Sequence, residues 1–174
     1  MSIENICNQA LDLVGHKRHI GSVYDGSPAA RIALNAYSET RDEVLASQPW
    51  QFARDFEVLV PAGPDAPLPM WLHHFVYPAR SVQLLDVYPS GLAPEDILDP
   101  APLRWLEVTD RHLAAPQRGI LTNFSPAMSI FTARIVDTDA WPAEFTRSVI
   151  HQLAQKFTRS LGGGDAPKQS EQKQ

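Results

Sequence analysis

The chain has 174 residues, enough for one domain or for one domain with an inserted lobe, and it can bury a core without disulfides or metals. Hydrophobic residues make up 44% and charged residues 20%, which is ordinary for a globular protein, and no stretch approaches the length of a membrane span. The net charge of −5 argues against a protein that binds nucleic acid by neutralising phosphates. Cys7 is the single cysteine, which excludes an internal disulfide and is consistent with a soluble protein of a reducing cytoplasm.

The first helix is predicted between Ile3 and Val14, where apolar residues recur at helical spacing. Ser2 is placed to cap its first turn, and Gly15 follows as the residue that ends it. Cys7 lies on its apolar stripe, so we expect the thiol to be buried. A polar connection follows up to Gly26.

The second helix begins at Ser27-Pro28, with serine as N-cap and proline at the first helical position, and Pro49 ends it near Gln48. Its predicted apolar stripe is Ala30, Ala33, Leu34, Tyr37, Val44 and Leu45, and Arg41 interrupts it. A lone buried charge is costly, so this arginine must be paired or lie at an interface. A carboxylate partner in the same chain, or a side chain that reaches out to solvent, is simpler than a direct partner contact.

The helical period disappears between residues 51 and 137, where most of the prolines lie. Two proline-rich segments there, residues 61–69 and 89–102, are long for loops in a compact domain and are typical of binding or mobile segments. Short β-like runs separate the turn-rich segments: Phe56–Val60, Ser81–Val87, Leu103–Thr109, Gly119–Asn123 and Met128–Val136.

The last helix is predicted to begin near Trp141-Pro142 and to end before Gly162, with one apolar ridge formed by Phe145, Val149, Leu153, Phe157 and Leu161. The sequence therefore predicts an α+β protein. Residues 1–50 and 138–161 form an antiparallel helical bundle of about three long helices, and residues 51–137 form a β-rich insertion, a small sheet or partial barrel. Residues 162–174 are expected to be a flexible C-terminal tail.

No catalytic, cofactor or metal motif is recognisable. His73 and His74 are adjacent, so on a strand they point to opposite faces and cannot share one metal. The run Gly162-Gly163-Gly164 follows a helix rather than preceding one, so it cannot hold a phosphate at a helix N-terminus. We expect no enzymatic activity, no cofactor and no metal.

Three segments resemble the tail tubular protein A family, the head-to-tail adaptors of short-tailed bacteriophages. They are Asn8 to Gly15, the turn Ser22-Val23-Tyr24-Asp25-Gly26, and Tyr37 to Ala53 with Arg41, Pro49, Trp50 and Phe52. Tyr77-Pro78-Ala79, the strand Gly119–Asn123 and the closing helix match the family in order. Arg41, Pro49, Trp50 and Phe52 are the positions that define the motif.

The resemblance implies a structural virion protein at the head-tail junction, assembled in the host cytoplasm. Copies form a ring, a dodecamer in the family, which binds the phage portal protein and receives the tail nozzle protein. Genomic DNA passes through the lumen without specific binding, and no membrane is involved.

For the portal contact, our hypothesis is the tail from Gly162 to Gln174, with Gly162, Gly163, Gly164, Lys168 and Lys173. For contacts with neighbouring copies or the tail, it is the loops Ala62–Trp71 and Pro89–Pro102, with Pro64, Pro67, Trp71, Leu92 and Ile97. Two alternatives remain open: a domain that binds a small ligand or peptide in the β-rich lobe, and a hydrolase with a Ser/His/Asp cluster formed only in the folded chain.

Overall fold

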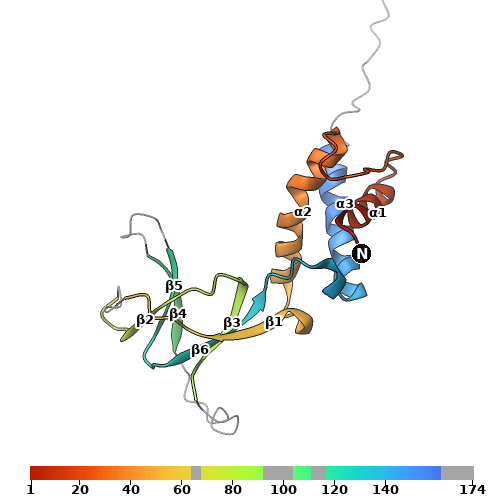
Figure 1. The fold of residues 1–174 in the computed structure, drawn as a ribbon. Coiled ribbons are helices and arrows are strands. Elements are labelled where there is room, and N and C mark those ends of the chain that lie inside the picture. The colour runs from red at the N-terminus through yellow and green to blue at the C-terminus, as the bar shows by residue number, and fades with distance from the viewer. Residues whose placement is uncertain (64–67, 92–103, 111–116, 162–174) are drawn as a thin grey trace, which may run out of the picture. The chain divides into compact units, whose positions relative to one another are not determined.

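A computed structural model describes residues 1–63, 68–91, 104–110 and 117–161 of the chain. The chain divides into two compact units (Figure 1). Met1–Gln48 and Ile135–Gln174 form the helical unit, and Pro49–Arg134 form the β unit. The β unit is an insertion between the second and the last long helix.

The helical unit contains α1 (Ile3–Leu13), α2 (Pro28–Ser47), the short 3-10 helix η3 (Thr138–Ala140) and α3 (Ala143–Leu161). Both predicted N-caps are confirmed: Ser2 Oγ accepts from the Asn5 N–H at 3.2 Å, and Ser27 Oγ accepts from the Ala30 N–H at 3.1 Å. Gly15 follows α1 with φ +73°, a left-handed conformation that glycine adopts without strain.

The core of the helical unit lies where α1 and α2 pack against α3. The predicted ridge of α3 is fully buried at Phe145, Val149, Leu153 and Phe157. Ile6 and Leu11 of α1 and Leu45 of α2 are fully buried as well. Asn8 fixes the connection between α1 and α2, because its amide donates to the Ile20 carbonyl at 3.0 Å and its carbonyl accepts from the Ile20 N–H at 2.8 Å. Asn8, one of the family-like residues, therefore has a structural role in this connection.

The β unit begins with the short 3-10 helix η1 (Gln51–Ala53) and contains six described strands: β1 (Arg54–Val58), β2 (His73–Val76), β3 (Ser81–Pro89), β4 (Trp105–Asp110), β5 (Gln117–Thr122) and β6 (Ala127–Ala133). They form two antiparallel three-stranded sheets. The order is β1-β6-β3 in the first sheet and β2-β5-β4 in the second. Among the described residues of the β unit, the large side chains that are fully buried are Phe75, Val87, Ile120, Leu121 and Phe131.

The predicted fold class is wrong in its emphasis. About 40% of the described residues are helical and 27% lie in strands, so the protein is α+β with two small sheets and not predominantly a helical bundle with one sheet or partial barrel. The physical reason is β2, which the sequence analysis missed. It is four residues long and begins with two histidines, and it joins the second sheet by pairing with the distant β5. Its backbone also bonds to residues 60–62.

The chain enters and leaves the β unit through neighbouring strands. Arg54, at the start of β1, is the register partner of Thr132, near the end of β6. The final run was predicted to extend to Val136, but the strand ends at Ala133, and Val136 is 59% exposed in the helical unit.

Candidate functional site

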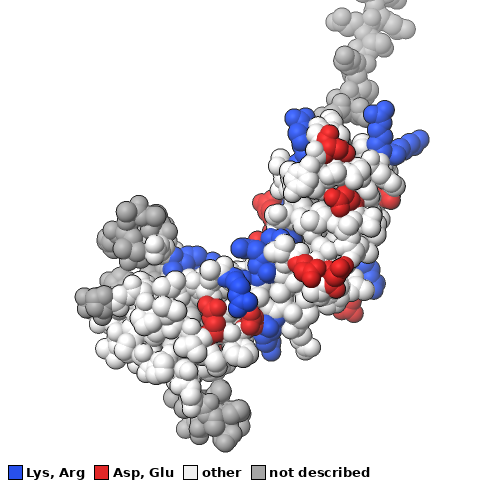
Figure 2. Space-filling model, in the orientation of Figure 1, with Lys and Arg blue, Asp and Glu red and all other residues white. Residues whose placement is uncertain are grey.

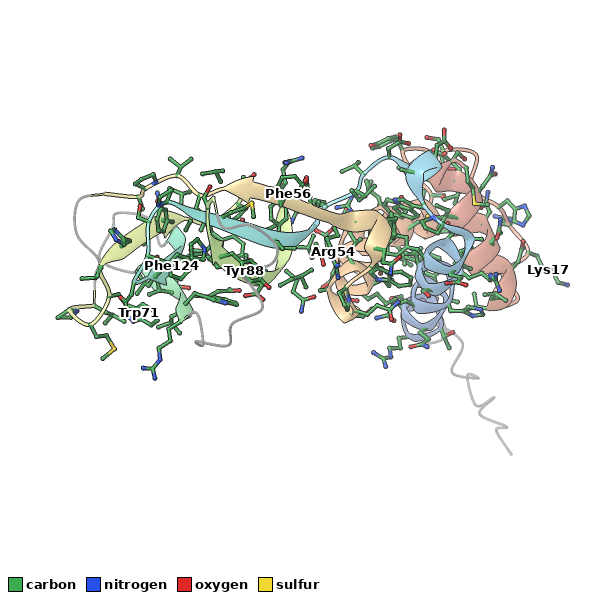
Figure 3. All side chains as sticks on the ribbon, turned by 90° about the horizontal axis from the view of Figure 1, so that it is seen from below. Lys17, Arg54, Phe56, Trp71, Tyr88 and Phe124 are labelled. Atoms are coloured by element: carbon green, nitrogen blue, oxygen red, sulfur yellow. The ribbon has the colours of Figure 1, made fainter. Side chains whose placement is uncertain are left out.

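One face of the first sheet exposes apolar side chains to solvent. Phe56 and Val58 on β1 are 68% and 57% exposed, and their register partners on β6 are the half-buried Ile130 and Met128. Cross-strand partners lie on the same face with their Cβ atoms about 5 Å apart, so the four side chains are contiguous. We call Phe56, Val58, Met128 and Ile130 the apolar strip; Figure 3 labels Phe56 on its strand.

The apolar strip reaches an edge of its sheet. Among the described strands, β1 pairs with β6 on one side only. The outer side of an edge strand carries N–H and C=O groups that can pair with another chain. Arg54, exposed at the start of β1, is a charge of the kind that limits unspecific edge pairing. An apolar face beside an open edge is typical of a surface that binds another protein.

Polar groups flank the apolar strip on β3. Asp86 and Tyr88 are register partners of Ile130 and Met128, so they share the face of the strip. Asp86 Oδ2 accepts from the Tyr88 hydroxyl at 2.5 Å, and Asp86 Oδ1 accepts from the Trp105 indole at 3.2 Å. The hydrogen bond to Asp86, followed by burial and by the charge of Asp86, raises the pKa of Tyr88 above its usual value. The phenol therefore stays neutral, and this polar border has a defined geometry.

Exposed apolar side chains are concentrated in the β unit more generally. Of the thirteen large hydrophobic side chains that are exposed among the described residues, eight belong to it: Phe56, Val58, Val60, Leu68, Met70, Leu72, Val76 and Leu106. Figure 2 shows a broad uncharged area on the visible face of this unit. Scattered exposed apolar residues are normal in any protein, so the contiguous strip is the more informative feature.

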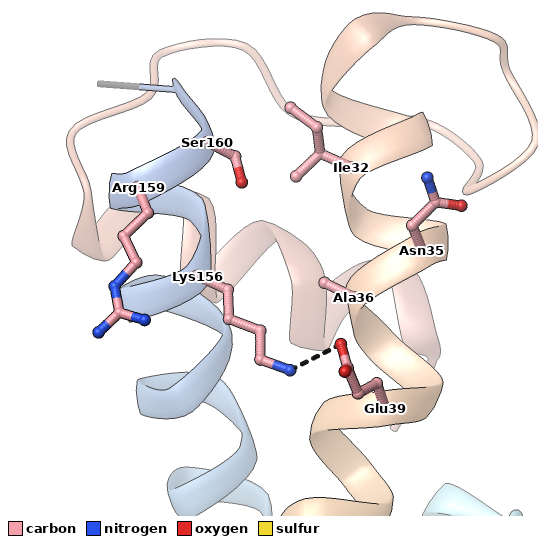
Figure 4. A pocket seen from close by; sticks show the side chains of 7 residues that line it. All are labelled: Ile32, Asn35, Ala36, Glu39, Lys156, Arg159 and Ser160. Atoms are coloured by element: carbon pink, nitrogen blue, oxygen red, sulfur yellow. Dashed lines mark hydrogen bonds and ion pairs between the residues drawn. The ribbon is translucent and has the colours of Figure 1, made fainter. Parts of the chain in front are cut away.

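The helical unit has an open groove of about 320 Å³ between α2 and α3 (Figure 4). Lys156 on α3 crosses it and donates to Glu39 and Glu43 on α2, at 3.0 Å each. Burial alone would lower the pKa of Lys156, but the hydrogen bonds and charges of the two glutamates raise it. The lysine is thus held in its charged form as a link between two helices, which is a structural role.

The motif residues are structural where they are described. Arg41 is 7% exposed on α2, and its Nε donates to Asp42 Oδ1 at 2.8 Å, so it has a carboxylate partner in its own chain. Pro49 follows the end of α2, and the half-buried Trp50 and Phe52 make an edge-to-face contact with their ring centres 6.2 Å apart. Pro49, Trp50 and Phe52 form the start of the β unit, and Arg41 lies in the helical unit. None of the four belongs to the apolar strip.

Most of the predicted contact residues lie outside the described residues: Pro64, Pro67, Leu92, Ile97, Gly162, Gly163, Gly164, Lys168 and Lys173. Trp71 is described. It is half-buried before β2, and within the described part of the chain its indole N–H is buried without a hydrogen-bond partner. The structure does not bring Trp71 into the apolar strip.

Sequence reasoning missed all four residues of the apolar strip, although a signal was present. In a strand that buries one face, apolar residues alternate with polar ones. In β6, Met128 and Ile130 lie on one face while Ala127, Phe131 and Ala133 lie on the other. Apolar residues on both faces of a strand in so small a sheet indicate a second covered surface, either internal or with a partner.

The two adjacent histidines of β2 make different contacts. His74 lies across β5, where a Cβ at Gly119 would collide with its Nε2, so glycine at 119 is what admits the imidazole. His73 instead contacts Phe75, with ring centres 6.2 Å apart. Within the described ranges, no three His, Cys, Asp or Glu side chains are grouped as metal ligands would be.

None of the described helices has the length and apolar character needed to cross a bilayer. In comparisons with known proteins, no family model matches the chain, and no curated protein matches its sequence significantly.

Proposed function

We propose that this protein is a structural subunit of a phage head-to-tail adaptor. Copies form a ring that binds the portal, closes the filled capsid, lets DNA pass and offers the tail nozzle a docking platform. Two observations support the proposal: the family-like residues between Asn8 and Ala53, and the exposed apolar strip beside an open sheet edge. The second observation carries the proposal. An apolar face that is exposed in the single chain is expected when a partner covers that face in the assembly.

A ring is built from heterologous contacts, so each copy must present two different surfaces to its neighbours. We assign the apolar strip to one of these surfaces. Its core of Phe56 and Val58 with a polar border at Asp86 and Tyr88 resembles the general plan of protein interfaces, an apolar centre with a polar rim. The net charge of −5 suits a lumen that DNA passes without binding. In this role the protein has no catalytic task.

The test is to mix the purified chain with the portal ring from the same genome and to measure the complex by native mass spectrometry. We expect several copies on each portal ring. The double variant Phe56→Ser/Val58→Ser should bind fewer copies, because it removes the centre of the strip, while its thermal stability stays close to that of the wild type. Leu13→Ser, at a residue on α1 that is 56% exposed, is the matched control and should assemble normally.

Absence of any portal complex, with both proteins folded, would overturn the adaptor proposal and favour a ligand- or peptide-binding domain. Full assembly by the double variant would remove the strip from the interface but leave the adaptor role. A chain truncated after Leu161 tests the tail hypothesis separately. If it binds the portal with undiminished affinity, Gly162–Gln174 does not form the portal contact.

A further inference from the structure

A second surface lies in the helical unit, at the connection between α1 and α2. It is a cavity of about 240 Å³. Ile20, Pro28 and Ala29 supply its apolar lining, and His16, Arg18 and His19 supply basic groups around it. Asp25 also lines it, but its Oδ1 is occupied by the Ser27 N–H at 2.9 Å. The cavity has room for an aliphatic side chain, with cations beside it for neighbouring carboxylates.

The positive charge at this cavity is largely unused within the described residues. Lys17 and Arg18 are exposed, and neither has an ion-pair partner in the described part of the chain. Figure 3 shows Lys17 projecting away from the helical unit. His19 does have a partner, since its Nε2 lies 2.7 Å from Asp12 Oδ1. A partner that combines apolar and acidic groups would complement both the lining and the charge.

The chain itself contains one short segment with this chemistry. Residues Glu95-Asp96-Ile97-Leu98-Asp99 carry three carboxylates and two branched aliphatic side chains in succession. This segment lies outside the described residues, within the loop for which a neighbour contact is predicted from the sequence. We propose that the cavity beside Arg18 receives the Glu95–Asp99 segment of a second copy. The proposal rests on the ring arrangement proposed above and supplies its second, heterologous surface.

A peptide fits this surface better than a phosphate backbone does. Ile20, Pro28 and Ala29 offer nothing to a phosphate, whereas they can pack against an aliphatic side chain of a peptide. Ile97 or Leu98 would fill the apolar cavity, while Glu95, Asp96 and Asp99 would lie near Lys17 and Arg18. The apolar anchor supplies affinity, and the charges select the partner and the direction of approach.

The experiment is to titrate the full-length chain into a fluorescently labelled peptide of residues 92–101 and to follow anisotropy. Saturable binding is expected, and it should weaken as salt is added. Lys17→Glu/Arg18→Glu should weaken it about tenfold or more, because it reverses two charges next to the acidic segment. A peptide with Ile97→Ser/Leu98→Ser should lose a similar factor. Arg159→Glu, at an exposed arginine on α3 away from the cavity, is the matched control and should bind as the wild type does.

A charge exchange sharpens the test. A peptide with Glu95→Lys/Asp96→Lys should bind the Lys17→Glu/Arg18→Glu chain better than it binds the wild type. Absence of binding, or binding equal for all variants, overturns the proposal. A single-stranded oligonucleotide that binds more tightly than the peptide, with the same dependence on Arg18, also overturns it and assigns the surface to nucleic acid.

The remaining alternative is that the Glu95–Asp99 segment binds the cavity of its own copy. A receptor chain with Glu95→Gln/Asp96→Asn/Asp99→Asn cannot fill its own cavity by charge pairing. If the peptide binds only this receptor, the contact is intramolecular and the second-copy proposal fails. Portal binding is measured independently of the peptide. Portal assembly without peptide binding removes only this contact, and peptide binding without portal assembly removes only the adaptor role.

Discussion

The indole Nε1 of Trp105 donates a hydrogen bond to Oδ1 of Asp86 across 3.2 Å, which joins β4 of the second sheet to β3 of the first. The other oxygen of the same carboxylate accepts from the Tyr88 hydroxyl. One side chain thus ties the two sheets of the β unit together and borders the apolar strip. Its removal would leave two part-buried donors without their acceptor.

We therefore expect Asp86→Ala to lower the free energy of unfolding by about 1–3 kcal/mol. Asp86→Asn keeps an acceptor oxygen for the Trp105 indole and should lose less. Urea denaturation followed by tryptophan fluorescence measures both. An Asp86→Ala chain that is as stable as the wild type would show that this link does not stabilise the β unit.

The raised pKa of Tyr88 predicts a dependence of stability on alkaline pH. The phenol ionises less readily in the folded state than at the usual tyrosine pKa of 10.0. A group whose pKa is raised in the folded state contributes its full stabilisation of that state at pH values below its unfolded pKa. This stabilisation is lost as the pH rises through the folded pKa. Tyr88→Phe should therefore reduce the loss of stability between pH 10 and the folded pKa. Identical pH dependence of Tyr88→Phe and wild type, measured by denaturant midpoint, would contradict this.

Cys7 should be inert in the native protein. The residue is fully buried, and burial, followed by the nearby charge of Glu4, raises the pKa of its thiol to about 12. At pH 8 the thiolate, which is the reactive form, is then only about one part in ten thousand. We expect negligible labelling by a thiol reagent until urea unfolds the chain, and labelling of one thiol afterwards. Rapid labelling without denaturant would mean that α1 opens readily from the core.

The Arg41–Asp42 pair predicts an asymmetry between its two members. Asp42→Ala leaves the guanidinium of Arg41, 7% exposed, without this carboxylate and should destabilise the protein by about 2–4 kcal/mol. Arg41→Met replaces a buried charge by an apolar side chain of similar length and should cost about 1 kcal/mol or less. Thermal unfolding of both variants measures the two losses of stability and shows whether they differ. Equal costs would show that the charge on Arg41 is not what makes Asp42 necessary.

The helices could be predicted well because their signals are local. Ser2, Ser27 and Gly15 act within one helical turn of their own positions, and the ridge from Phe145 to Phe157 is visible as a simple period. The stripe of α2 was less reliable. Leu34 was assigned to the buried face but is 41% exposed, because tertiary packing decides which part of a broad stripe is covered.

The sheets could be predicted only in part because strand pairing is not local. β2 is recognisable only beside β5, where Phe75 and Ile120 are register partners and both are buried. The apolar strip could not be predicted from apolar content alone, because the same residues in β1 and β6 are compatible with a covered inner face. Whether Phe56 is covered depends on the neighbouring layer, which no short window of sequence contains.

The pairing of Arg54 with Thr132 has a consequence for how this protein can change. The two ends of residues 49–134 lie on adjacent, hydrogen-bonded strands. The β unit is therefore an insertion into a helical host domain, and its first and last strands lie side by side. Such insertions can be exchanged, shortened or enlarged with little cost to the host, because its chain has only a short gap to close. Selection can therefore replace the lobe, together with whatever it binds, while the helices continue to fold as before.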